Sequence, residues 1–340
     1  MSEELASVVR RVLADAGGTG HARADHGRAR GRDDAAWKAL ASTGVLGLLL
    51  PDSGAGLREV GAVCGELGGV CSPLPYISSA VGALSLLPAD DPWAVRIADG
   101  DAIGVPALLE PRRGYDLTPS AAVRGDRITG EKVHVADAGA ADLFLVTAGD
   151  GVWAVAADAV EVVPEPSTDG SRPEARVVLN DAPGTRVGGL DLVAPAVDRV
   201  RAALVADAVG GARAAFALAL DYSKVREQFG VVVGSFQAVQ TLLVDTMQDV
   251  EMAAVTSRNA LEVLDDADVD ADERHRAVVL AKAVAAEALP RALERCIQVH
   301  GGIGFTWEHD IGLFYKRALS LAAAYGDQTA MYAELAALVV

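Results

Sequence analysis

Hydrophobic residues in the first hundred positions recur three and four apart, which is the spacing of one face of an α-helix. The earliest such face consists of Leu5, Val8, Val9, Val12 and Leu13. The same spacing returns in residues 37–45, and again in residues 57–70 after the Pro/Gly break that ends GVLGLLLPDSGAG. This pattern predicts a helical N-terminal domain over residues 1–100.

Between residues 101 and 192 the pattern changes to short runs rich in valine, such as DLFLVTA, GVWAVAA and ARVVLND. Gly-Asp, Asp-Gly and Pro-Glu pairs separate these runs, and such pairs are typical of turns. Short valine-rich runs between closely spaced turns indicate strands that pair with their neighbours. We therefore expect a small antiparallel β domain over residues 101–192.

Helical spacing returns after residue 193 and is sustained. It is found in four segments, residues 197–223, 235–266, 273–299 and 311–338. The acidic run DDADVDADE at 265–273 separates two of these segments and is typical of a solvated loop. Long helices pack side by side, so residues 193–340 are expected to form a C-terminal four-helix bundle. The predicted fold class is α+β.

The chain carries 47 Asp and Glu against 30 Lys and Arg, which gives a formal net charge of −17. An acidic surface repels phosphate backbones, so we expect no nucleic-acid partner. Apolar runs are shorter than the roughly 20 residues that span a bilayer, and the first residues do not resemble a secretory signal. Three cysteines without a C-x-x-C pair do not build a disulfide framework. We expect a cytoplasmic protein without a membrane span.

The segment DYSKVREQFGVVVGSFQAVQ, residues 221–240, joins the end of one predicted helix to the start of the next. Two glycines interrupt the helical spacing, and Ser235 is a typical N-cap for the helix that follows. Arg226 and Gln228 lie just before the break, where a planar guanidinium can bind two oxygens of a diphosphate. An arginine at a helix end also interacts with the helix dipole, so this segment alone leaves both roles open.

A second segment, CIQVHGGIGFTWEHDIGLFYKRA at residues 296–318, places a Gly-Gly pair after a helix. Glycines leave a bare backbone that a ligand can approach closely. The segment has neither the Lys-Ser/Thr tail of a P-loop nor the preceding strand of a dinucleotide fingerprint. Its charged residues are expected to form structural salt bridges, Glu308 with Arg317 or Asp310 with Lys316.

Together, VREQFGVVVGSFQAVQ and QVHGGIGFTWEHD resemble the C-terminal bundle of the acyl-CoA dehydrogenase family. WKALASTGVLGLLLPDSGAG resembles the family's N-terminal helical domain, and GEKVHVADAGAADLFLV resembles its middle β domain. The resemblance implies an acyl-CoA dehydrogenase-like fold, in which two helical domains flank a β domain. It also implies a dimer of dimers that binds FAD at a subunit interface.

The resemblance also implies which residues hold FAD. Those that would contact its diphosphate and adenosine side are Arg226, Gln228 and Phe229. Those that would contact its ADP part from the neighbouring subunit are Gln298, Gly301 and Gly302. In the family, a carboxylate removes the α-proton of an acyl-CoA thioester while a hydride passes to the flavin. The electrons then leave through an electron-transfer flavoprotein.

The family places its catalytic base in one of two positions, and neither holds a carboxylate in this chain. One is the glutamate of a Tyr-Glu-Gly-Thr segment, where residues 325–328 read Tyr-Gly-Asp-Gln and Gly326 stands in the glutamate's place. The other, in the helix before VREQFG, aligns with Val200. Asp207 lies two helical turns beyond Val200 on the same face, and Asp327 follows the first position by one residue. These two aspartates are the candidate substitutes.

The middle domain departs from the family where it would face the flavin ring. After Gly-Glu-Lys the family carries an aromatic and a hydroxyl residue, whereas this chain has His134 and Ala136. Upstream, the family's Thr-Glu-Pro-x-x-Gly-Ser-Asp becomes Leu-Glu-Pro-Arg-Arg-Gly-Tyr-Asp at residues 109–116. The ring-facing half of the site is therefore eroded, while the ADP half is retained. No second metal-type residue accompanies His134, so we expect no metal site.

A chain that keeps one half of a shared site could complete the site of another chain. Some actinobacterial members of the family form such heterotetramers and act on steroid side-chain thioesters. The leading hypothesis is therefore the subunit without the catalytic glutamate in an α2β2 acyl-CoA dehydrogenase. Two alternatives stay open: a homotetrameric dehydrogenase with Asp207 or Asp327 as base, and a flavin-free acyl-CoA-binding or scaffold protein.

Overall fold

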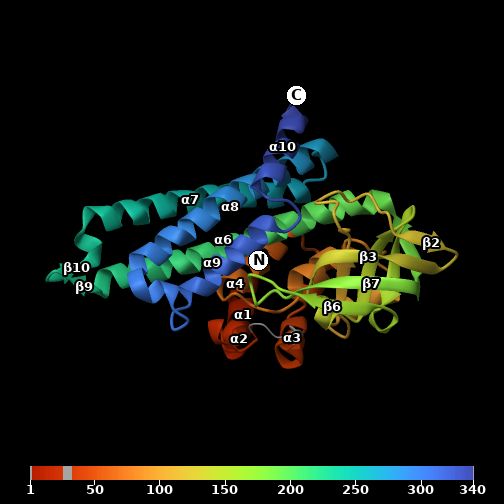
Figure 1. The fold of residues 1–340 in the computed structure, drawn as a ribbon, viewed down its shortest axis with the longest axis horizontal. Coiled ribbons are helices and arrows are strands. Elements are labelled where there is room, and N and C mark those ends of the chain that lie inside the picture. The colour runs from red at the N-terminus through yellow and green to blue at the C-terminus, as the bar shows by residue number, and fades with distance from the viewer. Residues whose placement is uncertain (1, 26–32, 340) are drawn as a thin grey trace.

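A computed structural model describes residues 2–25 and 33–339 of the chain. The molecule is elongated: β2, β3, β6 and β7 lie at one end, and the N-terminal helices α1, α2 and α3 lie near the middle, below the long helices (Figure 1). Long C-terminal helices cross this part and extend to the opposite end, where β9 and β10 are found. The predicted α+β order, helices followed by strands and then long helices, is confirmed.

The N-terminal region consists of short helices packed around a buried centre. They are α1 (Ser2–Asp15), α2 (Thr19–Asp25), α3 (Asp34–Ala41), α4 (Leu57–Gly69) and α5 (Pro92–Ala98), with a π-helical segment at Ile77–Ala83. Asp33 caps α3, because its carboxylate accepts hydrogen bonds of 3.0 Å from the backbone N–H groups of Ala35 and Ala36. Trp37 and Leu40 of α3 point into the core and are almost fully buried.

The strands form two four-stranded sheets. One has the order β1 (Gly104–Ala107), β4 (Leu143–Ala148), β5 (Gly151–Ala156), β8 (Thr185–Gly189). The other has the order β2 (Ala122–Arg124), β3 (Arg127–Ala136), β7 (Glu174–Pro183), β6 (Glu161–Glu165). Neighbours pair antiparallel as expected, apart from β1 and β4, which are parallel. The long connection between β1 and β4, which passes through the other sheet, allows the chain to return in the same direction.

The C-terminal region is built from long helices joined by short connections. They are α6 (Val193–Val225), α7 (Gln237–Asp265), α8 (Ala271–His300), α9 (Ile311–Ala323) and α10 (Gln328–Val339), with the small hairpin β9 (Glu227–Gln228) and β10 (Val231–Val232). The predicted helix over 311–338 is broken, because Tyr325 and Gly326 have φ of 54° and 125°. Ser235 is not the N-cap of α7, since its hydroxyl donates instead to the carbonyl of Val232 (2.7 Å).

The acidic run 265–273 does more than connect α7 and α8. The carboxylate of Asp265 accepts hydrogen bonds from the backbone N–H groups of Leu57 and Arg58, at 2.7 and 3.0 Å. These are free N–H groups at the start of α4, so Asp265 caps a helix from another part of the chain. Asp270 caps α8 itself. The expected solvated loop is therefore wrong for Asp265, whose side chain is mostly buried.

Helix α6 lies at the centre of the molecule. Leu190–Val225 is apolar and long enough to cross a membrane, but 61% of its most apolar window is buried in the fold, and core helices pass the same test. Glycines allow α4 to pack closely against α6. A Cβ at Gly68 would lie 1.9 Å from the carbonyl oxygen of Asp207, and one at Gly210 would lie 2.0 Å from that of Gly65.

A cluster of charged side chains holds α10 against α6 and α8. His275 Nδ1 lies 2.8 Å from Asp198 Oδ2, and its Nε2 lies 3.0 Å from Glu334 Oε1. Arg201 donates to both oxygens of Glu334, at 3.0 and 3.1 Å. Hydrogen bonding to Asp198 and then to Glu334 raises the pKa of His275 to about 9. The protonated imidazole therefore bridges two carboxylates from different helices.

We expect His275→Gln to remove a pH-dependent part of the stability. The folded pKa of His275 lies above its unfolded value of about 6.5, so its contribution is complete below pH 6.5 and is lost as pH rises through about 9. The difference in unfolding free energy between wild type and variant should be about 1–3 kcal/mol at pH 6 and near zero at pH 10. Urea unfolding at both pH values measures it. A difference that is equal at the two pH values would contradict a bridging imidazolium.

Candidate functional site

A cavity of ≈ 480 Å³ lies between the middle sheets, the π-helical segment and the ends of α6 and α9. Its wall is largely apolar, and the side chains that give it this character include Ile77, Leu109, Val200, Leu204 and Leu319. A cavity of this size matches small-molecule sites, which span about 300–1,000 Å³. It is therefore the first candidate for a functional site.

Both family positions for the catalytic base lie at this cavity. Val200 lines it from α6 and is 5% exposed. Tyr325 lines it from the break between α9 and α10, and Gly326 follows directly. A side chain at Gly326 would collide with Met331, whose Cε would lie 2.3 Å from the new Cβ. The first position is thus filled by an apolar side chain. The second has a φ of 125°, which strains any residue other than glycine.

Asp207 does not line the cavity, because it forms a buried ion pair. Arg317 Nε donates to Asp207 Oδ1 at 2.9 Å, and Nη2 donates to Oδ2 at 2.7 Å. Arg317 Nη1 also donates to the carbonyl of Ser72 (3.0 Å) and to Ser171 Oγ (3.1 Å). Burial alone would lower the pKa of Arg317, but the attraction of Asp207 outweighs burial and raises it. The carboxylate is fully engaged as a structural partner.

Asp327 is engaged as a helix cap. Its Oδ1 accepts a hydrogen bond of 2.9 Å from the backbone N–H of Ala330 in the first turn of α10. The residue is exposed and is not part of the cavity wall. Neither aspartate proposed from the sequence lines the cavity, and both side chains are engaged in structural contacts.

Glu174, which no sequence motif singles out, lines the cavity from β7. His134, expected at the ring-facing position, also lines the cavity, and its Nδ1 lies 3.2 Å from Glu174 Oε2. Ala136 is part of the same wall. Tyr115, in the loop that departs from the family pattern, closes another part of it. Strand pairing of β3 with β7 brings His134 and Glu174 together, which residue spacing alone does not reveal.

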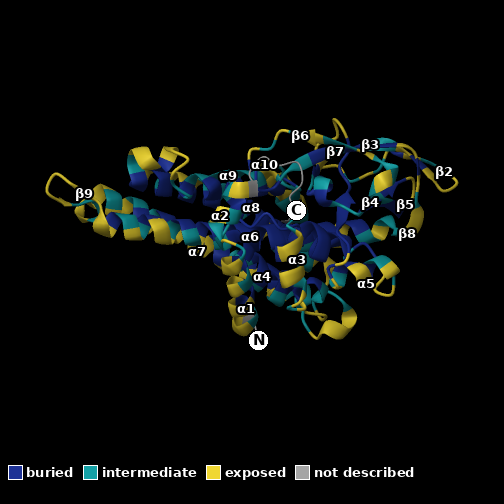
Figure 2. Cartoon of the chain, turned by 90° about the horizontal axis from the view of Figure 1, so that it is seen from below, coloured by how far each residue is buried: buried dark blue, intermediate teal, exposed yellow. Residues whose placement is uncertain are grey.

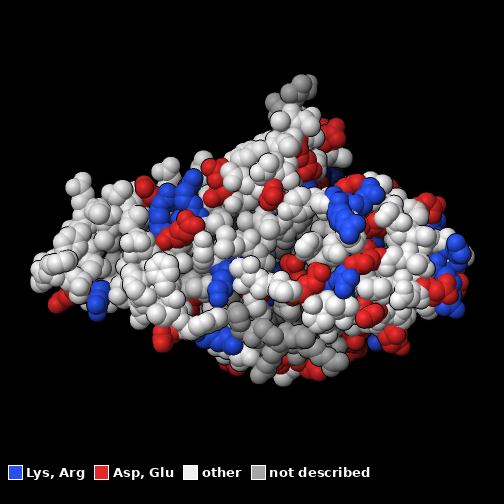
Figure 3. Space-filling view, viewed as in Figure 1, with Lys and Arg blue, Asp and Glu red and all other residues white. Residues whose placement is uncertain are grey.

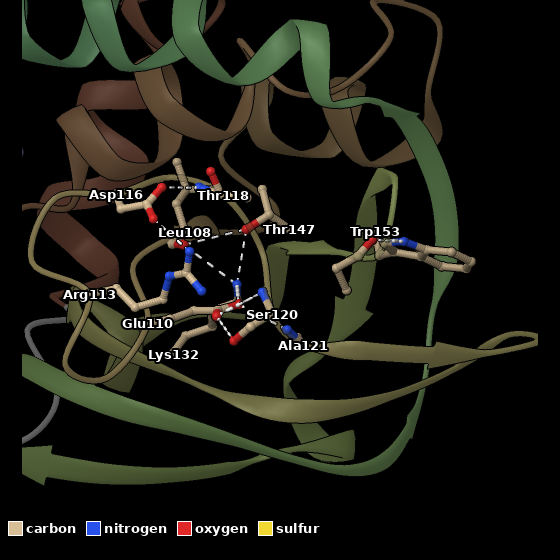
Figure 4. A network of polar contacts seen from close by, with 11 residues as sticks. Leu108, Glu110, Arg113, Asp116, Thr118, Ser120, Ala121, Lys132, Thr147 and Trp153 are labelled. Carbon is tan, nitrogen blue, oxygen red and sulfur yellow. Dashed lines mark hydrogen bonds and ion pairs between the residues drawn. The ribbon is translucent and has the colours of Figure 1, made fainter.

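A buried polar network fixes the loop that carries Tyr115 (Figure 4). Lys132 Nζ donates to Glu110 Oε1 at 2.7 Å and to Thr147 Oγ1 at 3.0 Å, and both charged side chains are nearly inaccessible. Glu110 also accepts hydrogen bonds from the backbone N–H of Ser120. Burial would raise the pKa of Glu110, but these bonds lower it to about 2. The Glu and Lys that this chain shares with the family motifs therefore have a structural role here.

The predicted ADP-side residues lie at the opposite end of the bundle. Arg226, Gln228 and Phe229 are exposed on the β9–β10 hairpin, and Phe229 is 95% exposed (Figure 2). The visible face of this end carries few charged side chains (Figure 3). No hydrogen bond or ion pair of the Arg226 guanidinium is found with the part of the chain that the structure describes. The hairpin thus presents the Arg226 guanidinium together with the carboxylate of Glu227, an amide and apolar groups.

The second motif lies beside the first in space. The rings of Tyr222, one turn before Arg226, and His300 have centroids 4.8 Å apart. Gln298 is exposed, and a Cβ at Gly301 or Gly302 would meet no atom within 4 Å. The bare backbone predicted from the sequence is therefore open to a ligand.

Aromatic side chains near the Gly-Gly pair were not predicted from the sequence. Phe305 is 77% exposed and Trp307 is 56% exposed, and Lys316 Nζ lies 4.1 Å from the centroid of a Trp307 ring. The expected salt bridges differ as well. Arg317 pairs with Asp207 rather than with Glu308, and Asp310 pairs with Arg23 of α2 rather than with Lys316. Both partners come from distant parts of the sequence, which local spacing does not indicate.

Comparison with known proteins agrees with this architecture. The family model "Acyl-CoA dehydrogenase, C-terminal domain" matches residues 188–339. Acyl-CoA dehydrogenase IpdE2 of Mycobacterium tuberculosis is 31% identical over 323 residues, covering 92% of this chain and 89% of IpdE2. FadE34 of the same organism is also 31% identical, and the matched part spans 42% of its length and 89% of this chain. The chain belongs to the acyl-CoA dehydrogenase family.

Two solved structures are similar over nearly the whole chain. The ChsE4-ChsE5 complex from Mycobacterium tuberculosis matches with a TM-score of 0.89 and 26% identity, covering 99% of this chain and 96% of that chain. The Tcur3481-Tcur3483 steroid ACAD G363A variant matches with a TM-score of 0.89 and 27% identity, covering 99% and 97%. Both confirm the acyl-CoA dehydrogenase-like fold.

FAD is the cofactor of the acyl-CoA dehydrogenase family, in agreement with the cofactor predicted from the sequence. The residues at the far end of the bundle fit its ADP part, because a free guanidinium and an open glycine backbone suit a diphosphate. The cavity wall lacks the hydroxyl that the family carries at Ala136.

We expect Asp207→Asn to destabilise the protein by about 3 kcal/mol, because it removes the bidentate partner of the buried Arg317 and leaves only the more distant Asp169, 3.9 Å away, as a counter-charge. The free energy of unfolding in urea measures the loss. Glu251→Gln is the matched control, since Glu251 pairs with Arg213 at the surface and should change stability by less than about 1 kcal/mol. Equal stability of the two variants would show that the buried pair has no special role.

We expect Gly326→Ala to cost about 1–3 kcal/mol, because its φ of 125° is strained for any residue with a Cβ, and the end of the Met331 side chain must also move. Gly312→Ala in α9 is the control, since its Cβ would meet no atom within 4 Å, and it should leave stability unchanged or slightly higher. Thermal unfolding of both variants measures the difference. A Gly326→Ala protein as stable as wild type would mean that a side chain fits at this family base position.

Proposed function

We propose that this chain is the subunit without a catalytic base in an α2β2, FAD-dependent acyl-CoA dehydrogenase. It would present Arg226, Gln228, Phe229, Gln298 and the Gly301-Gly302 pair to the ADP part of FAD bound by a second acyl-CoA dehydrogenase-like chain. That partner would supply the ring-facing surface and the glutamate. The assembly would desaturate an acyl-CoA thioester and pass electrons to an electron-transfer flavoprotein.

The observation that carries the proposal is the contrast between the two ends of the molecule. At the cavity, Val200 stands at one base position and Gly326 at the other, while Asp207 and Asp327 are engaged elsewhere. The α-proton of a thioester is weakly acidic, so its removal requires a positioned base. At the other end, the free guanidinium and the open glycine backbone are retained.

The similar proteins support a heteromeric assembly. One of the two similar structures is a ChsE4-ChsE5 complex, and the other is a Tcur3481-Tcur3483 steroid ACAD. By this similarity we propose steroid side-chain CoA esters as the substrate class. The free, buried cysteines Cys64, Cys71 and Cys296 fit a reducing cytoplasm as the place of action.

A homotetrameric dehydrogenase remains the second candidate, on the single observation that Glu174 lines the cavity. Its carboxylate is paired with His134, and it comes from the middle sheet rather than from either family base position. The third hypothesis is a flavin-free scaffold. It is not favoured by the described residues that are predicted to contact the ADP part of FAD. An absorbance spectrum of the purified protein for flavin bands addresses it directly.

The proposal is tested by purifying the chain alone and together with an acyl-CoA dehydrogenase-like chain encoded beside it. We expect little FAD and no thioester-driven dye reduction from the chain alone, and both from the complex. Arg226→Met in this chain should weaken FAD binding by the complex about 10–100-fold, because it removes a charge-assisted contact. Fluorescence titration of FAD into the apo-complex measures the affinity.

The matched control is Arg213→Met, which removes an exposed arginine of α6 that pairs with Glu251. It should leave the FAD affinity of the complex at the wild-type value. Full activity with one FAD per chain in the protein purified alone would reject the proposal.

A further inference from the structure

The cavity contains a cation to which neither the fold nor the proposed function assigns a role. Arg172 lies in the connection between β6 and β7, is 8% exposed, and lines the cavity. A guanidinium stays protonated throughout the physiological pH range. Its charge acts on Tyr325 in the same wall, where it opposes the larger effect of burial, which raises the pKa of that phenol to about 12.

Arg172 has no counter-ion within the described residues. Its backbone N–H donates to the carbonyl of Asp169 at 3.1 Å, but its guanidinium forms no ion pair or hydrogen bond with residues 2–25 or 33–339. The carboxylate of Glu174, which lies in the same wall, is paired with His134 instead. The other deeply buried arginine of this region, Arg317, has a bidentate partner.

A cation that is 8% exposed and has no counter-ion is poorly solvated, and most buried charges in proteins are paired. The Arg172 nitrogens are not among the fully inaccessible unpartnered atoms of the described residues, so a molecule in the cavity can reach them. Asp137, a nearby carboxylate, accepts a hydrogen bond from Ser78 and does not pair with Arg172. Arg172 lines the cavity, and its guanidinium has no partner among the described residues, which leaves it as an unused donor for an anion from outside the chain.

We propose that the cavity binds an apolar monocarboxylate, with Arg172 holding the carboxylate group. The planar fork of a guanidinium matches two carboxylate oxygens. A single cation beside one carboxylate, Glu174, suits one negative charge better than the two of a phosphate. The aliphatic wall from Ile77 to Leu319 suits a bulky hydrocarbon body, and ≈ 480 Å³ suits a small molecule.

The site is distinct from the proposed contribution to FAD binding. The cavity lies at the strand-bearing part of the molecule, whereas Arg226 and the Gly-Gly pair lie at the far end of the bundle (Figure 1). Carboxylate binding requires neither a partner chain nor flavin. Its test on the chain alone therefore succeeds or fails independently of the α2β2 proposal.

The test compares 1-adamantaneacetate with its neutral isostere 1-adamantaneacetamide by isothermal titration calorimetry on the purified chain. Both probes carry the same polycyclic hydrocarbon, so a difference in affinity reports the charge. We expect wild type to bind the carboxylate at least tenfold more tightly than the amide. Arg172→Met should weaken carboxylate binding by about 10–100-fold and leave amide binding unchanged. Arg172→Lys should bind the carboxylate with an affinity between those of wild type and Arg172→Met.

Two controls separate binding from a structural role. Arg176→Met removes an arginine four residues further on, which pairs with Glu131 and does not line the cavity, so it should bind like wild type. Because Arg172 is unpaired, Arg172→Met should melt at the wild-type temperature or higher. The proposal is overturned if wild type binds neither probe or binds both with equal affinity. It is also overturned if Arg172→Met binds the carboxylate as tightly as wild type does, or if this variant loses much of its thermal stability.

Discussion

The arrangement of the three regions around the cavity depends on the buried ion pair between Arg317 and Asp207. Arg317 comes from α9 and Asp207 from α6, and the same guanidinium reaches the carbonyl of Ser72 in the N-terminal region and Ser171 in the middle region. One side chain thus joins all three parts of the chain. Loss of one partner of a buried ion pair strongly destabilises a protein. The contacts of Arg317 therefore hold the three regions together around the cavity.

The same interaction limits what the chain can do chemically. It engages Asp207, which lies two turns beyond Val200, and the residues of α6 that line the cavity are Val200 and Leu204. The break after α9 is constrained in a similar way, since Gly326 is packed against Met331 and Asp327 caps α10. The contacts that stabilise α6 and α10 therefore also engage both aspartates that the sequence offers as substitutes for the family's base.

Local pattern predicted much of the fold, because helical periodicity is strong in long amphipathic segments. The bounds of α6, α7 and α8 lie within a few residues of the predicted ones. The break at residues 324–327 was missed, because it arises from two positive φ angles within an otherwise helical composition. The partners of Arg317 and Asp310 were also missed, since each pairs across more than a hundred residues of sequence.

The candidate site, like the fold, could be predicted from the sequence only in part. Motif alignment assigns Val200 and Gly326 to the family's two base positions, and the structure puts Val200 and Tyr325, the neighbour of Gly326, in the cavity wall. Arg172 and Glu174 lie outside every motif used, and their place in the wall follows from the packing of the β6–β7 connection and β7 against the bundle. Such positions depend on tertiary contacts, and the spacing of hydrophobic residues along the chain does not predict them.

The absence of a working base is tested most directly by exchange of the thioester α-proton, which requires a base but no electron acceptor. The purified chain is incubated in D2O with octanoyl-CoA and with a steroid side-chain CoA thioester, and deuterium at the α-carbon is measured by mass spectrometry. We expect no incorporation above the rate without protein. Incorporation that disappears in Glu174→Gln or Asp327→Asn would contradict the absence of a base and make the chain a complete catalyst.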